Sequence, residues 1–363
     1  MSSRSLRPDD GWAPRLPTVG TAAFRRLAVV SLVFEALILL SGAAVRLSGS
    51  GLGCADWPDC STGHLTPPLQ FHSVIEFGNR LVTVVLVIVV GVTFLAALRR
   101  RPFRRDLAWL SGVLVAGIVA EAVVGGIVVY TKLNPYLVLV HFVTTVALLA
   151  AAVVLVHRAT FDYTPGRRHL LVPPAMLVLG RGLVVLLGIV LVAGSATTGA
   201  APDAGGAQGQ LVARRIPVAL HDLAELHATL ALFLVGVALA TAVALHAIDV
   251  PERVRRGGRM MVVTLFVQAA VGYTQYFTHL PAVLVEVHEL GATLLVIGIL
   301  QLWLAFTHHP LEVEATARRM VESPLGAAAP ADLVGARGPT GTVSSVSHMS
   351  DESPVSGPAG TAW

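Results

Sequence analysis

Residues 73–97 read SVIEFGNRLVTVVLVIVVGVTFLAA, and this apolar run decides the fold class. About 20 residues of helix cross the roughly 30 Å of hydrocarbon in a bilayer, so the run predicts a transmembrane helix. Seven other runs have the same character, at 24–45, 107–130, 136–158, 174–196, 221–247, 259–278 and 281–306. The sequence therefore predicts an all-α integral membrane protein with eight transmembrane helices.

The composition of the chain agrees with a membrane protein. Of its 363 residues, 54% are hydrophobic and 13% are charged, and the mean hydropathy is +0.72, which excludes a water-soluble enzyme. The net charge of +4 is basic, but the arginines lie in short clusters between the apolar runs. This pattern is typical of membrane topology, so we expect membrane lipid as a partner and no nucleic acid.

The arginine clusters also predict the orientation of the chain. They lie in the N-terminal tail, at 98–106, at 158–168 and at 253–259, whereas the intervening segments hold few basic residues. Because basic loops stay in the cytoplasm, both termini are predicted to be cytoplasmic. No small-residue cleavage pattern follows the first run, so we interpret it as a retained span of a multi-pass protein of the cell (cytoplasmic) membrane.

An internal repeat groups the predicted helices into two repeated four-helix bundles. GGIVVYTKLNP (125–135) precedes His141, and VGYTQYFTHLP (271–281) precedes His288. The predicted domains are a cytoplasmic N-tail at 1–23, an N-terminal half at 24–158, a cytoplasmic linker at 159–173, a C-terminal half at 174–306 and a disordered cytoplasmic tail at 307–363.

Three histidines lie well inside the apolar runs, away from their ends, namely His141, His227 and His288. Each is about 9 to 10 Å from the outer end of its predicted helix, and imidazoles at one depth on neighbouring helices suit axial ligation of haem iron. The alternative is that each imidazole only hydrogen-bonds a neighbouring helix. For the pair His227 and His288 we favour ligation, because chance rarely places two at equal depth in one half.

The first half differs at the position that corresponds to His227. There the second helix carries Asn79, so His141 is the only candidate ligand of that half. A haem bound there would have an open or weakly held coordination position, which suits chemistry better than electron transfer.

Glu76 lies three residues before Asn79, on the same face of the second helix. A carboxylate inside an apolar span is costly and is a functional candidate by default. The alternative is a salt bridge to Arg80 or Arg46 that orients the outer loop. Four other polar residues in the spans are interpreted as contacts between helices, namely Glu35, Glu121, Gln268 and Glu286.

The two cysteines, Cys54 and Cys60, lie in GLGCADWPDC on the outer, oxidising side. A turn that contains Trp57 and Pro58 brings them within reach of each other, so we favour a structural disulfide. A redox or haem-transfer role for the pair is the alternative.

Four stretches together resemble the haem A synthase family of cytochrome oxidase assembly: VRLSGSGLGCADWPDC (45–60), IEFGNR (75–80), GGIVVYTKLNP (125–135) before His141, and QYFTHLP with VEVHELGA (275–281 and 285–292). The resemblance extends over about 24–306. It implies an oxidoreductase that converts the methyl group at position eight of haem O to a formyl group, giving haem A for haem-copper terminal oxidases.

The resemblance also implies roles for individual residues. His227 and His288 would ligate a retained haem b, and His141 would ligate the iron of the substrate, haem O. Glu76 would be catalytic as a proton donor or acceptor, with Asn79 and Arg80 as neighbours, and the outer cysteine pair would be Cys54 and Cys60. Asn79 stands where the family has a histidine, and APDAGG (201–206) lacks a histidine that many relatives have.

Haem O synthase is an expected partner, because it makes the substrate, and the electron donor would be a quinol or a ferredoxin-like protein. A non-catalytic di-haem membrane cytochrome is the main rival function, since it shares the histidines. A transporter built from repeats is a weaker rival, because it would be expected to have interrupted helices with charges at the midplane.

Overall fold

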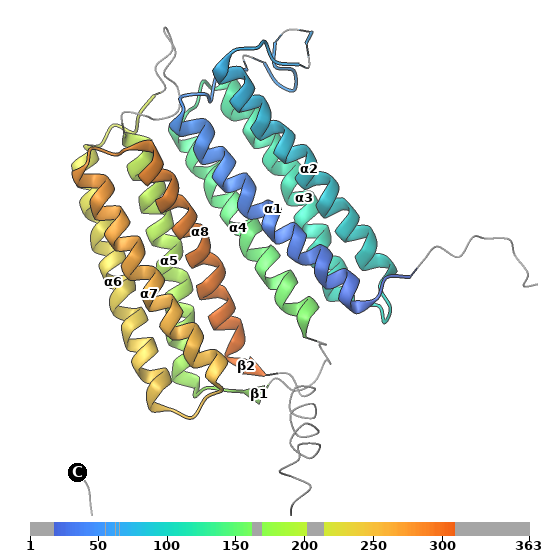
Figure 1. Cartoon of the computed structure of the whole chain (residues 1–363), viewed down its shortest axis with the longest axis vertical. Helices are drawn as coiled ribbons and strands as arrows, with labels where there is room; N and C mark the ends of the chain where they lie inside the picture. The colour runs from blue at the N-terminus through green and yellow to red at the C-terminus, as the bar shows by residue number, and fades with distance from the viewer. Residues whose placement is uncertain are drawn as a thin grey trace, which may run out of the picture. The chain divides into compact units, whose positions relative to one another are not determined.

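The computed structural model describes residues 18–308 apart from 55, 62, 65, 162–168 and 202–213. It contains eight long helices in this part of the chain (Figure 1), with the bounds α1 Thr21–Leu47, α2 Phe71–Arg99, α3 Arg105–Tyr130, α4 Pro135–Thr160, α5 Pro174–Ala200, α6 Leu220–Ala247, α7 Glu252–Phe277 and α8 Ala282–Ala305. All eight are long and apolar enough to cross a membrane. The predicted all-α class with eight transmembrane helices is confirmed.

The helix bounds agree with the predicted runs except at the start of α7. That helix was expected from residue 259 but begins at Glu252, directly after Pro251. Hydropathy marks only the apolar part of a helix, whereas arginine is itself a good helix former. The arginines between 253 and 259, expected in a loop, therefore form the first turns of α7.

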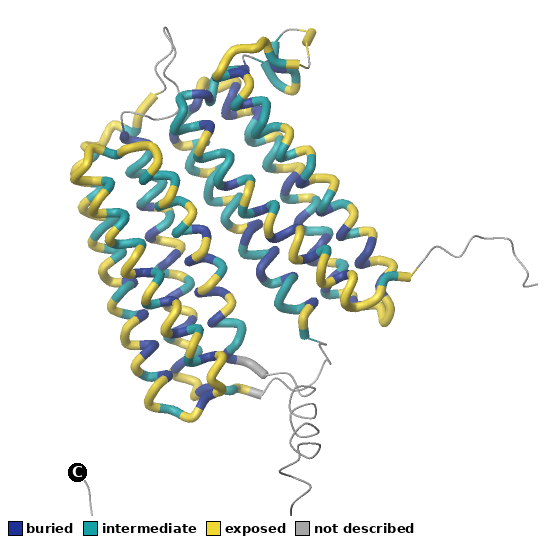
Figure 2. Tube along the Cα trace, viewed as in Figure 1, coloured by how far each residue is buried: buried dark blue, intermediate teal, exposed yellow. Residues whose placement is uncertain are grey.

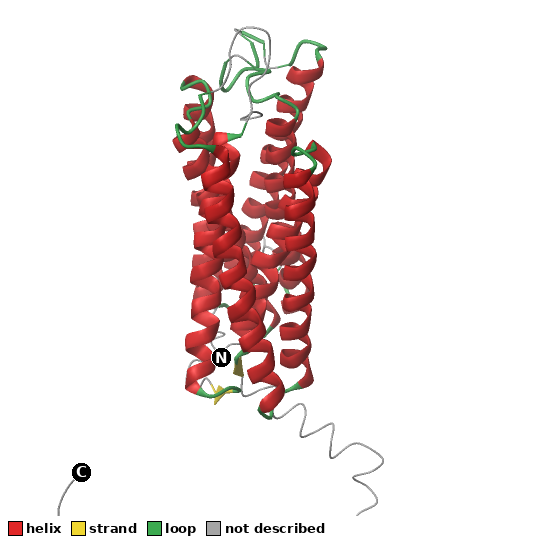
Figure 3. Ribbon diagram, turned by 90° about the vertical axis from the view of Figure 1, so that its left-hand side faces the viewer, coloured by secondary structure: helices red, strands yellow, loops and turns green. Residues whose placement is uncertain are grey.

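The helices pack four and four. Each of α1 to α4 contacts its neighbours in a ring, and α5 to α8 form a second ring (Figure 1). The two rings meet where α4 and α1 pack against α8, and α4 packs against α5. All eight helices run along one direction, and the connecting loops gather at their ends (Figure 3).

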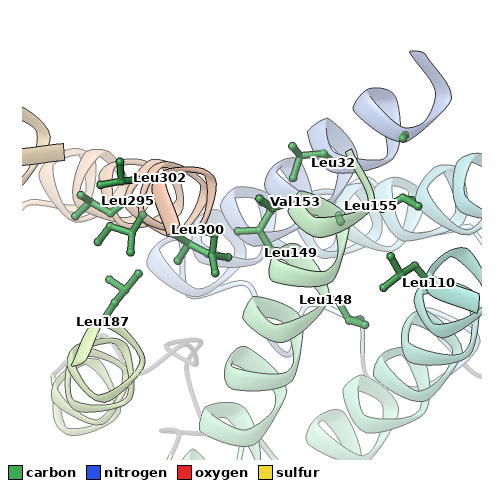
Figure 4. Close-up of a cluster of buried hydrophobic side chains, with 14 of the residues drawn as sticks. Leu32, Leu110, Leu148, Leu149, Val153, Leu155, Leu187, Leu295, Leu300 and Leu302 are labelled. Atoms are coloured by element: carbon green, nitrogen blue, oxygen red, sulfur yellow. The ribbon is translucent and has the colours of Figure 1, made fainter. Parts of the chain in front are cut away.

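Leucine, valine and alanine side chains from both rings form one continuous buried cluster. Leu149 and Val153 of α4 lie in it together with Leu187 of α5 and Leu295 of α8 (Figure 4). Many residues on the outward faces of the helices are exposed (Figure 2). They include large apolar side chains, among them Trp109, Phe233 and Val243, which are 68%, 65% and 69% exposed. Such a surface is stable in lipid rather than in water, so the chain is a multi-pass membrane protein.

Two pairs of segments meet at the ends of the helices that the arginine pattern assigns to the cytoplasm. Val19 pairs with the backbone of Arg99 and Arg101. Two short strands that the sequence did not predict, β1 His169–Leu170 and β2 Thr307–His308, pair antiparallel, so the expected linker meets the start of the expected tail. Residues 1–17, 162–168 and 309–363 lie outside the described part, and cytoplasmic termini and the domain boundaries stay predictions.

The turns that connect α3 to α4 and α7 to α8 share an unusual backbone. Lys132 and Leu133 have φ values of 54° and 60°, and His279 and Leu280 have values of 63° and 60°. Two consecutive residues with positive φ are uncommon without glycine. The two stretches that sequence similarity pairs thus adopt the same turn.

Candidate functional site

Two of the three predicted histidines lie opposite each other in the second ring. His227 lies in α6 and His288 in α8, seven and six residues after the first residue of each helix. Their ring centres are 6.3 Å apart, with an angle of 75° between the ring planes. The Nδ1 atom of His227 lies 3.0 Å from the carbonyl oxygen of Val190 on α5, which orients this ring.

Glycines make room for both rings. A Cβ atom at Gly194 of α5 would lie 2.9 Å from Cε1 of His227, and one at Gly272 of α7 would lie 3.1 Å from Cε1 of His288. A contact of 2.9 Å would force the ring of His227 to move, and one of 3.1 Å would require a shift of a few tenths of an ångström at His288, so glycine at both positions favours the observed placement of the rings. Each imidazole is therefore held against a neighbouring helix as well as by its own.

The spacing of this histidine pair fits a haem iron. With a metal–nitrogen bond of about 2 Å and about 1.1 Å from a ring nitrogen to the ring centre, two imidazoles on one iron have centres about 6 Å apart. The observed 6.3 Å matches that value. Imidazoles that are held in place by a carbonyl and by close backbone would be suited to hold the iron of a haem.

The third histidine, His141 of α4, has a different partner. Its Nδ1 atom lies 2.6 Å from Oε2 of Glu121 on α3. The hydroxyl groups of Thr144 and Thr145 both donate to the Glu121 carboxylate, the latter at 2.8 Å. The Glu121 side chain is 11% exposed, whereas that of His141 is 38% exposed. The first ring thus presents one accessible imidazole with a carboxylate behind it.

The Asn79 side chain is bonded to a neighbouring helix. Its amide oxygen accepts a hydrogen bond of 2.7 Å from the Ser41 hydroxyl on α1. Ser41 is six residues before the end of α1, as Gly194 is before the end of α5. In the first ring a serine and an asparagine therefore bond to each other at the level where the second ring has a glycine and a histidine.

Glu76 and Arg80 of α2 hold the loop between α1 and α2. Glu76 is 5% exposed, and its carboxylate accepts from the backbone N–H of Cys54 at 2.7 Å and pairs with Arg80 at 2.7 Å. Arg80 also donates to three loop carbonyls, those of Asp56, Pro58 and Asp59. These contacts match the ion pair to Arg80 that the sequence offered as the alternative to a catalytic Glu76, and none of them involves His141.

The predicted cysteine pair is joined in the structure. Cys54 and Cys60 form a disulfide, and both are buried. Between them, Trp57 lies against Gly126 of α3 and its carbonyl oxygen accepts from the Tyr130 hydroxyl at 2.6 Å. The adjacent glycine of α3, Gly125, faces the imidazole of His141. The disulfide loop and His141 thus contact neighbouring positions of one helix.

Glu121 differs from its expected role. The sequence predicts that Glu121, like Glu35, is a contact between helices, but in the structure its carboxylate is the partner of a candidate ligand, His141. Glu35 is fully buried in α1, and its carboxylate oxygens have no hydrogen-bond partner among the described residues. A signal was present in the spacing, because Glu121 precedes His141 by 20 residues and Gln268 precedes His288 by 20.

Comparisons with known proteins identify relatives. The COX15-CtaA family, described as "Cytochrome oxidase assembly protein", matches residues 25–74 and 69–300. A heme A synthase of Geobacillus kaustophilus is 32% identical over 113 residues, 30% of this chain and 34% of that protein. Heme A synthases of Bacillus pumilus and Shewanella oneidensis are 29% and 51% identical over 154 and 45 residues, which cover 42% and 12% of this chain and 49% and 13% of those proteins. The chain thus matches less than half the length of each relative.

Proposed function

The chain belongs to the COX15-CtaA family of cytochrome oxidase assembly proteins, and from this premise we propose that it oxidises the methyl group at position eight of haem O to a formyl group. The product, haem A, would serve the assembly of haem-copper terminal oxidases. The name heme A synthase among the relatives supports this proposal.

The observation that carries the proposal is the difference between the two rings. The second ring has two imidazoles, His227 and His288, with centres 6.3 Å apart. At the matching depth of the first ring, His141 is the one imidazole among the described residues, because Asn79 stands at the position that corresponds to His227 and is bonded to Ser41. A haem with two strong ligands suits electron transfer, whereas one with a single ligand is open for reaction. A di-haem electron carrier would be expected to have two ligands at both positions.

His227 and His288 would hold haem b, and His141 would bind the iron of haem O as the substrate. A bound haem supplies electron transfer and oxidation chemistry that side chains lack. The contribution of this chain would be to orient the imidazoles, through the Val190 carbonyl for His227 and the Glu121 carboxylate for His141. The apolar helices would exclude water around both sites.

Glu76 is the proposed catalytic carboxylate, as a proton donor or acceptor near the reacting methyl group. Its contacts to Cys54 and Arg80 also hold the loop that covers this end of α2 and α3. Two variants separate the roles. Glu76→Gln keeps an oxygen for the Cys54 N–H but loses the ionisable carboxylate, whereas Arg80→Gln keeps the carboxylate but removes the bonds to the loop carbonyls.

Haem O synthase is the proposed source of the substrate, and a quinol or a ferredoxin-like protein is the proposed electron donor. Conversion of a methyl to a formyl group removes four electrons from the substrate and adds one oxygen atom, so it needs an oxidant. With dioxygen as the oxidant, each of two successive hydroxylations would take two electrons from the donor and release one water, and loss of a further water from the product would leave the formyl group. The cytoplasmic membrane is the proposed location, because haem O is apolar and is made for membrane oxidases.

The test is to express the chain in a haem-O-producing host and to extract and separate the membrane haems. We expect haem A with the unaltered chain, and its loss in His141→Ala and Glu76→Gln. Haem O and haem b alone, with the protein present and folded, would contradict the proposed activity. If Glu76→Gln makes haem A normally while Arg80→Gln does not, Glu76 acts only by holding the loop.

A further inference from the structure

We propose that Glu121 is a positioning residue that fixes the imidazole of His141 and strengthens it as an iron ligand, which makes the first haem position electronically different from the second. The proposal rests on the assignment of His141 as a haem ligand under the proposed function. It concerns Glu121, Thr144 and Thr145, which form one cluster around the far side of the ring.

The geometry places the carboxylate where a ligand-orienting group belongs. Glu121 Oε2 lies 2.6 Å from Nδ1 of His141, which leaves Nε2 for the metal. Glu121 and Gly125 are four residues apart on α3, so they share a helix face, and Gly125 leaves space for the same ring. One face of α3 therefore both receives the imidazole and supplies its partner.

The second ring provides an internal comparison. Gln268 is 20 residues before His288, as Glu121 is before His141, and Gly272 and Gly125 are each 16 residues before the respective histidine. The side-chain amide of Gln268 donates to the backbone carbonyl of His288 at 2.7 Å. In the second ring, Gln268 therefore bonds to the backbone of α8. In the first ring, Glu121 at the same position contacts the imidazole of His141 itself.

The residues that follow each histidine explain why the two side chains differ in direction. Gly291, three residues after His288, has no side chain, and the Gln268 amide lies directly over it. The matching residue after His141 is Thr144, whose side chain occupies that space and donates to Glu121. Thr145 donates to Oε2, the same oxygen that faces His141. Two threonines thus keep the carboxylate turned toward Nδ1.

The chemical consequence follows from the partner of each ring. A carboxylate at Nδ1 draws the ring proton more strongly than a neutral carbonyl, which increases electron donation from Nε2 to a metal. His227 has only the Val190 carbonyl at 3.0 Å. An iron at His141 would therefore be richer in electrons, and its reduction potential would be lower, than at the same imidazole with a neutral partner at Nδ1.

The experiment uses the purified full-length holoprotein and haemin as the probe. For Glu121→Gln we expect haemin affinity at His141 to fall about 10- to 100-fold, the iron–histidine stretching frequency of the ferrous first-site haem to decrease, and its potential to rise. Glu121→Asp keeps the charge but withdraws the carboxylate, so it should show the same shifts. The haem at His227 and His288 should be unchanged in both.

Glu35→Gln is the control for loss of a nearby charge, because it removes another buried carboxylate of the first ring that interacts electrostatically with Glu121 but makes no hydrogen bond among the described residues. Unchanged affinity and frequency in both Glu121 variants would overturn the proposal, as would equal shifts in Glu35→Gln. If His141→Ala alters no haem signal, His141 is not a haem ligand, and the proposal is wrong for that reason. Haem A formation by the unaltered chain is scored separately, so failure of the proposed activity is distinguishable from failure of this positioning role.

Discussion

Replacing Gly194 by alanine is expected to displace His227 and to disrupt haem binding in the second ring. The new Cβ atom would lie 2.9 Å from Cε1 and 3.2 Å from Nδ1 of the imidazole. Carbon atoms in contact prefer about 3.5 to 4.0 Å, so the ring must move by about 0.6 Å or more. Metal ligands tolerate errors of about 0.2 Å. The required shift therefore exceeds what a two-imidazole site accepts.

The assay is the visible and electron paramagnetic resonance spectrum of purified protein, with haem content per chain. We expect Gly194→Ala to lose most of the low-spin, two-imidazole signal. Gly188→Ala on the same helix is the control, because nothing lies within 4 Å of a Cβ atom there. Both changes favour the helix by about 1 kcal/mol, so a difference between them reports the contact with His227.

Two further glycines lie farther from a histidine ring than Gly194 does, so replacing them by alanine should have smaller effects. A Cβ atom at Gly272 would lie 3.1 Å from His288, and one at Gly125 would lie 3.6 Å from His141. We therefore expect a partial loss of the low-spin signal in Gly272→Ala and no change at His141 in Gly125→Ala. A normal two-imidazole spectrum in Gly194→Ala, or a loss as large in Gly188→Ala, would refute the reasoning.

Two other predictions follow from the contacts. Asn79→His alone should not create a second ligand in the first ring, because the position that matches Gly194, counted from the helix end, holds Ser41, whose side chain contacts residue 79. The double variant Ser41→Gly with Asn79→His should convert the first haem to a low-spin, two-imidazole form. An identical spectrum for the single and double variants would contradict this. Arg104→Ala should lower the free energy of unfolding by about 2 kcal/mol, because it removes the ion pair with Asp106 at 2.7 Å and the bonds to the carbonyls of Arg158 and Phe161 at the end of α4. Denaturation in detergent measures this, with the exposed neighbour in Arg105→Ala expected to change it by less than about 0.5 kcal/mol.

The positions of the helices could be predicted because the cost of placing polar groups in hydrocarbon acts on each residue locally. The start of α7 was wrong for the same reason, since hydropathy records only the apolar part of a helix that begins at Glu252. The common depth of His141, His227 and His288 also followed from counting residues along helices with a constant rise. The disulfide could be predicted from the sequence because Cys54 and Cys60 are close together along the chain.

The partners of the polar side chains could not be predicted in this way. In the sequence, Glu76 and Glu121 are both carboxylates within apolar runs. Glu76 is the stronger candidate for the catalytic carboxylate on sequence grounds, because it is near Asn79 on the same helix face. In the structure Glu76 holds the disulfide loop with Arg80, while Glu121 reaches His141. Which of these contacts forms depends on how the helices face each other, and that depends on the whole packed bundle.

By itself the sequence determined that this chain crosses a membrane in eight helices and carries three histidines at one depth, because hydropathy and helical rise are properties of single segments. Only the tertiary structure decided that His227 and His288 face each other, that His141 has a carboxylate behind it, and that Asn79 is bonded to Ser41. The physical reason is that distances between side chains on different helices depend on small residues, such as Gly194 and Gly272, at the points where those helices approach.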